Sequence, residues 1–157
     1  MENSSFVYVT FIRTTPQKLW HALTTPEFMR TYFFGAAITP DPAWKKGAAW
    51  QMQFADGMIT DQGKVLEVVR RKRLVLRWRN EFMPALKAEG YSRCVMTLEP
   101  VKGAVKLTIT HTMDRPKSKT IEAVSGGWPQ ILSNLKSLLE TGKVAFKEKP
   151  PKPKIRR

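Results

Sequence analysis

The residues best suited to acid–base or nucleophilic chemistry near neutral pH are two histidines and one cysteine. His21 lies in a pattern typical of a short helix, and His111 lies at the end of a pattern typical of a strand. The chain has no G-x-S-x-G turn, no H-E-x-x-H helix and no acidic pair at metal spacing. We therefore favour structural hydrogen bonds over catalysis for both histidines and expect no catalytic residue.

Cys94 is the only cysteine, which excludes an internal disulfide and a cysteine-rich zinc site. It falls within a strand pattern, where we expect a small buried hydrophobe and not a reactive thiol. The acidic residues Glu67, Glu81, Glu89 and Asp114 are scattered over turns and strand ends. The sequence therefore predicts no metal and no cofactor.

The lone cysteine and the lack of a secretory leader favour a cytoplasmic location.

Apolar side chains that alternate along the strand patterns are stronger candidates for a binding site. Ligand pockets are lined mainly by apolar and aromatic groups with few polar ones. The side chains that alternation points inward, together with those facing them from the last helix, form the predicted lining: Trp50, Met52, Phe54, Leu76, Trp78, Leu107, Ile109, His111, Trp128 and Ile131. The same residues could instead fill a closed core, since aromatic side chains dominate protein interiors.

The elements that must position these side chains begin with a strand over residues 6–13, rich in aromatic and β-branched types. Thr14-Thr15-Pro16 and Thr24-Thr25-Pro26 each supply a capping hydroxyl and a proline suited to a first helical turn. The sequence therefore predicts two short helices in tandem directly after the first strand.

Between Gly35 and Gly103 short strands alternate with turns. The predicted strands cover residues 50–54, 59–69, 74–82, 92–99 and 104–112, with turns at Asp56-Gly57, at the basic run 70–73 and at Lys102-Gly103. Because consecutive strands with short links usually pair with each other, we expect an antiparallel meander.

The last element is a helix from about residue 118 to 140, with an apolar stripe of helical period. Gly126, Gly127 and Pro129 are expected to interrupt and bend it, and Gly142 is a good C-cap. The set of elements predicts an α+β fold, in which a curved antiparallel sheet of six or seven strands wraps the long helix.

Four segments, in order and at natural spacing, also resemble a known family. They are TPQKLWHALT at 15–24, GKVLE at 63–67 followed by 74–78, LTITHT at 107–112, and GWP at 127–129 leading to LLETG at 138–142. Residues 6–142 are similar to the single-domain bacterial proteins of the heat-shock protein 90 ATPase activator-like family, within the START-like or birch-pollen-allergen-like superfamily. The resemblance implies a helix-grip domain over residues 1–142 with a cavity, and it carries no reaction. One departure is Tyr32-Phe33-Phe34, where the family often has a tryptophan.

The chain carries a net charge of +14, of which the C-terminal fifteen residues contribute +6. From residue 143 to 157 there are seven Lys or Arg against one Glu, with several prolines, which predicts a flexible basic tail. Such a tail is compatible with an acidic protein partner, a phospholipid surface or nonspecific nucleic-acid contact. The run 70–73 is predicted to be the solvated tip of a hairpin. No stretch approaches the roughly 20 apolar residues of a membrane helix.

We therefore expect non-enzymatic binding of a small apolar or amphipathic ligand between the sheet and the long helix. One alternative is a protein-interaction role as an accessory to a chaperone, which would bind the chaperone and raise its ATP turnover. Another is an enzyme of the polyketide-cyclase kind, in which His111 and Tyr91 would position a substrate.

Overall fold

The computed structural model describes residues 3–149, in which eleven elements follow one another along the chain. They are β1 (Ser4–Ile12), α1 (Pro16–Thr24), α2 (Pro26–Tyr32), β2 (Ala37–Asp41), β3 (Ala49–Gln53), β4 (Ile59–Val69), β5 (Arg73–Asn80), α3 (Pro84–Lys87), β6 (Ser92–Val101), β7 (Ala104–Met113) and α4 (Lys119–Thr141).

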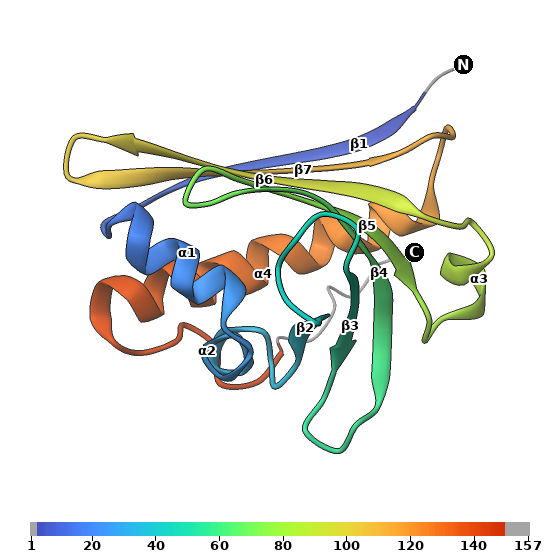
Figure 1. Cartoon of the computed structure of the whole chain (residues 1–157), viewed down its shortest axis with the longest axis horizontal. Helices are drawn as coiled ribbons and strands as arrows, with labels where there is room; N and C mark the ends of the chain where they lie inside the picture. Colours follow the sequence, from blue (N-terminus) through green and yellow to red (C-terminus); the bar gives the residue numbers. More distant parts are fainter. Residues whose placement is uncertain (1–2, 150–157) are drawn as a thin grey trace, which may run out of the picture.

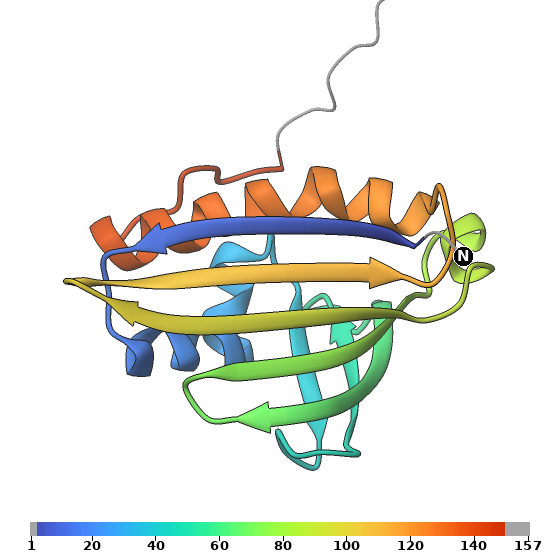
Figure 2. The same cartoon turned by 90° about the horizontal axis from the view of Figure 1, so that it is seen from above.

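The strands form one antiparallel sheet in the order β1-β7-β6-β5-β4-β3-β2. Figure 1 shows the sheet arching over α4, while α1 and α2 lie beside the helix on the same side. In Figure 2 the sheet turns so strongly that β2 and β3 run across the direction of β1 and β7. The structure confirms the α+β helix-grip fold, the meander and the tandem helices.

The sheet bends where its ladders are irregular. The register of β4 against β5 shifts between Val65 and Glu67, and that of β3 against β4 shifts between Met52 and Gln53. Such bulges bend a strand and increase its twist. The two shifts lie in the half of the sheet that turns across the direction of β1 and β7, so they help to form its curvature.

The first helices begin as their sequences predict. The Thr15 hydroxyl accepts a hydrogen bond from the Lys18 amide at 3.2 Å, and Pro16 occupies the first turn of α1. Two elements were not anticipated. The strand β2 is only five residues long and contains Pro40, and the four-residue helix α3 follows β5.

The expected interruption of α4 is wrong, because the helix runs unbroken from Lys119 to Thr141 with Pro129 inside it. Pro129 has no N–H to donate, so one intrahelical hydrogen bond is lost. The buried residues Trp128, Leu132 and Leu135 hold this part of the helix against the sheet. Packing of an apolar face commonly outweighs local propensity in this way. Gly142 adopts φ 83° and caps the helix as predicted.

The start of α4 is held by a carboxylate from a distant loop. Glu89 accepts hydrogen bonds from the Ser118 hydroxyl and from the backbone amides of Lys119 and Thr120. Burial by itself raises the pKa of Glu89, but these hydrogen bonds outweigh it and hold the pKa at about 2. The loop before β6 is thereby fixed to the helix by groups that a helix terminus leaves unsatisfied.

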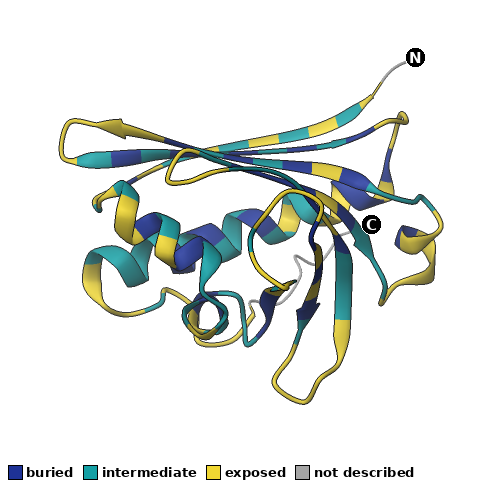
Figure 3. Cartoon of the chain, in the orientation of Figure 1, coloured by how far each residue is buried: buried dark blue, intermediate teal, exposed yellow. Residues whose placement is uncertain are grey.

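Buried residues recur along the strands of the sheet and along α4 (Figure 3). Within residues 3–149, no helix is both long and apolar enough to cross a bilayer.

The sequence predicted a flexible tail from residue 143, and the structure describes its first seven residues. Asn134 of α4 accepts a hydrogen bond from the Phe146 amide at 2.7 Å and donates one to the Phe146 carbonyl at 3.1 Å. The Ser137 hydroxyl donates to the Lys143 carbonyl, and Val144 packs on the core. Residues 143–146 are therefore fixed along α4, as Figure 2 shows. The last eight residues of the predicted tail, 150–157, lie outside the described residues.

Candidate functional site

Three tryptophans and His111 fill the centre of the grip. Trp50 comes from β3, Trp78 from β5, His111 from β7 and Trp128 from α4, and each is at most 5% exposed. The ring of Trp78 contacts all three others, with centroids 4.8 Å from Trp50, 5.7 Å from His111 and 5.9 Å from Trp128. We call these four residues the aromatic cluster. Its rings occupy the space that a large interior cavity would need.

The polar atoms of His111 are fully satisfied within this cluster. Trp128 Nε1 donates to His111 Nδ1 at 3.2 Å. Because an indole N–H only donates, Nδ1 must be unprotonated and the neutral ring carries its proton on Nε2. That proton is donated to Ser92 Oγ at 2.7 Å, and the Ser92 hydroxyl donates in turn to the Trp78 carbonyl at 3.1 Å.

This direction of donation is the reverse of what a nucleophilic serine needs. In a serine–histidine pair the imidazole accepts the serine proton, whereas here Ser92 accepts from His111. Burial also lowers the pKa of His111 to about 4. The structure therefore places His111 as a neutral structural hydrogen-bonding residue.

The buried neutral imidazole predicts a pH-dependent stability. An unfolded histidine has a pKa near 6.5, so between about pH 6.5 and pH 4 the unfolded chain binds a proton that His111 does not. The free energy of unfolding should therefore fall as the pH falls, by about 2 kcal/mol at pH 5 relative to pH 7. Urea unfolding of the protein and of His111→Gln at both pH values checks this. An equal pH dependence in the two proteins would contradict the assignment to His111.

A small pocket opens where α2, β3 and α4 meet. It has a volume of about 200 Å³, and its lining includes Phe33, Phe34, Met52, Phe54, Gln130 and Ile131. We call it the mouth pocket. Phe54 is 37% exposed at its rim, while Gln130 Oε1 is buried with no hydrogen-bond partner among the described residues. The lining of the mouth pocket is thus mainly apolar, with Thr60, Gln130 and Lys149 as its polar members.

The predicted lining residues fall into three groups. Met52, Phe54 and Ile131 line the mouth pocket, whereas Trp50, Trp78, Trp128 and His111 form the aromatic cluster. The fully buried residues Leu76, Leu107 and Ile109 belong to the hydrophobic core. The predicted lining did not include Phe33, Phe34 or Gln130, although the run Tyr32-Phe33-Phe34 was expected to reshape a wall of the pocket. The only signal was the aromatic run after the second helix, together with the position of Gln130 next to Ile131.

The other candidate residues lie elsewhere. The ring of Tyr91 lies under the Arg77 guanidinium at 4.0 Å, and its hydroxyl accepts from Gln62 Nε2 at 2.7 Å. Since Arg77 is exposed, the structure does not bring Tyr91 into the aromatic cluster with His111. Cys94 is fully buried, and burial raises the pKa of its thiol.

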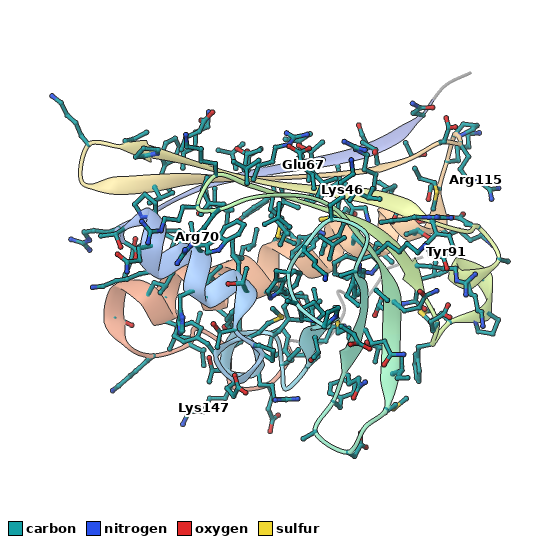
Figure 4. All side chains as sticks on the ribbon, viewed as in Figure 1. Lys46, Glu67, Arg70, Tyr91, Arg115 and Lys147 are labelled. Carbon is teal, nitrogen blue, oxygen red and sulfur yellow. The ribbon has the colours of Figure 1, made fainter. Side chains whose placement is uncertain are left out.

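A second, larger groove of about 750 Å³ lies on the outside of the domain, between α1, α2, the turn joining β4 to β5, and the end of α4. Its lining includes Lys18, Trp20, His21, Phe28, Arg70 and Arg71, and we call it the cationic groove. Figure 4 shows Arg70 beside α1. The basic run 70–73 was predicted to be a solvated hairpin tip, and the two arginines at the centre of its turn are exposed as expected.

Comparison with known proteins gives three kinds of result. A family model described as "Activator of Hsp90 ATPase homolog 1-like protein" matches residues 13–140. No curated protein sequence matches the chain. Many solved structures do match. Those that are less than 25% identical to this chain support the fold alone.

Three of these structures illustrate the similarity. A protein of Mesorhizobium loti is 24% identical with a TM-score of 0.73, over 90% of this chain and 100% of its own. A Cytophaga hutchinsonii protein is 27% identical with a TM-score of 0.69, over 90% and 98%. A Plasmodium falciparum protein described as an HSP90 activator is 20% identical with a TM-score of 0.69, over 87% and 96%.

Proposed function

Because this chain belongs to the family of activator of Hsp90 ATPase homolog 1-like proteins, with the helix-grip fold of its neighbours, we propose that it is a non-enzymatic protein that binds one small apolar ligand in the mouth pocket. The observation that carries the proposal is the buried, unpartnered Gln130 Oε1 beside an otherwise mainly apolar lining. A buried acceptor without a partner is costly. A ligand with one N–H or O–H donor would satisfy it.

The pocket volume limits the ligand to one or two small rings. An engineered apolar cavity of about 150 Å³ holds benzene, and the mouth pocket has about 200 Å³. The aromatic cluster closes the interior behind it, so a larger lipid would have to displace Trp128 or Trp78. Phe33, Phe34 and Phe54 offer ring faces and edges, which suit a flat aromatic guest. The preferred ligand is therefore a small aromatic molecule with one donor.

The network around His111 supports a role without catalysis. Its two ring nitrogens and the Ser92 hydroxyl are all engaged with protein groups. His111 is fully buried, so no proton-transfer group of the cluster faces a bound molecule. The polyketide-cyclase alternative needs His111 and Tyr91 at one substrate, and their separation weakens it.

The test uses a matched pair of probes. Indole has one N–H donor, and 1-methylindole has the same ring system without it. We expect indole to bind about fivefold more tightly, because the unmethylated ring satisfies Gln130 Oε1 and a well-placed hydrogen bond is worth on the order of 1 kcal/mol. Two-dimensional NMR titration of the full chain measures both affinities and locates the shifts.

Gln130→Leu is the informative variant, because it removes the acceptor and keeps a side chain of similar size. It should erase the preference for indole over 1-methylindole. Gln51→Leu makes the same change at an exposed position of β3 and should leave the preference intact. No binding of either probe, or shifts outside the mouth pocket, would refute the proposal.

A second candidate, favoured by the family match, is an accessory role toward a chaperone. A structural neighbour from Plasmodium falciparum is described as an HSP90 activator. We extend the accessory role to this chain because it matches the family model of activator of Hsp90 ATPase homologs. Adding the protein to an Hsp90 chaperone and measuring ATP turnover tests this role, because an accessory raises turnover without any small ligand.

Both proposed functions are compatible with the cytoplasmic location suggested by the single cysteine. Neither makes use of nucleic-acid contact through the basic tail.

A further inference from the structure

The face of α1 that looks away from the core carries a mixed set of polar, aromatic and cationic side chains. Leu19, Ala22 and Leu23 are the buried residues of this helix. The opposite residues recur at helical spacing and line the cationic groove: Gln17, Lys18, Trp20, His21 and Thr24. Phe28 of α2 and Leu139 of α4 complete its apolar surface. The groove therefore offers an apolar floor with cations at its edge.

Two of these cations come from a tight turn of unusual geometry. The Lys72 amide donates to the Val69 carbonyl at 2.9 Å, which closes the turn around Arg70 and Arg71. Arg71 adopts φ 66°, a left-handed conformation that glycine adopts at little cost and a long side chain does not. Strained residues of this kind often mark functional positions. Here the strained residue lines the groove.

The charge of the groove is uncompensated. Lys18, Arg70 and Arg71 form no ion pair with any residue that the structure describes, whereas Arg73 at the end of the same turn pairs with Glu67 at 3.2 Å. Among residues 3–149, no carboxylate lines the groove. Cations gathered without counter-charges favour an anionic ligand.

We propose that the cationic groove is a second binding site, independent of the mouth pocket, for an organic anion with a flat apolar body, such as an aromatic carboxylate. The apolar body would lie on Trp20 and Phe28, and the carboxylate would meet Arg70 and Arg71. Arginine suits this role because its planar guanidinium binds carboxylates in a bidentate way. A volume of about 750 Å³ accommodates a ligand of two or more rings.

The experiment compares 2-naphthoate with 2-naphthamide, which has the same rings and no charge. In NMR titrations of the full chain we expect naphthoate to shift the Trp20 indole N–H signal and the amides of α1 and the β4–β5 turn. Naphthamide should bind at least about tenfold more weakly, because charge-assisted hydrogen bonds are worth on the order of 1.5–3 kcal/mol. Acetate, which lacks the apolar body, should produce no saturable shifts.

Two double variants with the same charge change separate the groove from the overall field of the protein. Arg70→Gln with Arg71→Gln should weaken naphthoate about tenfold or more without lowering the melting temperature. Lys64→Gln with Arg93→Gln removes two exposed cations elsewhere on the sheet and should leave the affinity unchanged.

Three results would overturn the proposal. Equal affinity for naphthoate and naphthamide would show that the cations do not select the ligand. An equal loss in both double variants would show a general effect of net charge. Shifts at Phe54 and Gln130 with none at Trp20 would place the ligand in the mouth pocket. The indole titrations test the mouth pocket, and the naphthoate titrations test the cationic groove. Either proposal can therefore fail while the other holds.

Discussion

Gly63→Ala should destabilise the protein by about 3–5 kcal/mol, because the two central strands leave no room for a methyl group. A Cβ built on Gly63 would lie 1.6 Å from the Arg77 carbonyl oxygen and 3.0 Å from the Trp50 ring. The Arg77 carbonyl is fixed, since it accepts a hydrogen bond from Trp50 Nε1 at 3.1 Å. Relief therefore requires movement of β5 away from β4, which disturbs the aromatic cluster.

The chain offers a matched control for this substitution. Gly126 lies inside α4 and is exposed, and nothing lies within 4 Å of a Cβ added there. Gly126→Ala should raise the free energy of unfolding by about 0.5–1 kcal/mol, because alanine has the higher helix propensity. Urea unfolding of both variants gives the two values. A loss below 1 kcal/mol for Gly63→Ala would mean that β4 and β5 separate easily, contrary to the structure.

The sequence predicted the fold well where one pattern dominates a segment. In β5 the alternation of Leu74, Leu76 and Trp78 with the exposed Arg77 predicted the strand and its inner face. In α1 the hydroxyl of Thr15 directly before a proline predicted the start of the helix. The short strand β2, Ala37–Asp41, was missed because it has no alternating pattern and contains Pro40. Its pairing with β3 depends on tertiary contacts.

The site was harder to predict than the fold. Alternation gives the direction of a side chain, so Trp50 and Trp78 were expected to point inward, and they do. It does not give the distance between rings from different elements, and that distance decides whether they enclose a cavity or fill it. The mouth pocket depends on where α2, β3 and α4 converge, which no local pattern around Gln130 reveals. The groove around Arg71 likewise needs the turn to lie against α1.

Trp128→Ala should cost about 3–5 kcal/mol, the usual range for removing a buried aromatic side chain. Trp128 is 4% exposed and packs against Phe33, with ring centroids 5.9 Å apart. Its loss would leave a cavity between α4 and the sheet. It would also remove the donor to His111 Nδ1, a buried acceptor that nothing else in the described structure satisfies.

Two further measurements test how the loss divides between packing and hydrogen bonding. Trp128→Phe keeps one aromatic ring but removes the N–H donor together with part of the indole, so it should cost less than Trp128→Ala and at least the ~1–3 kcal/mol of an unsatisfied buried acceptor. Indole added to Trp128→Ala should recover part of the lost stability, because the new cavity has the shape of the missing side chain. Thermal unfolding of the three proteins, with and without indole, measures both effects. If Trp128→Ala loses little stability, the interior of the grip is already open, and the closed aromatic cluster is the wrong description.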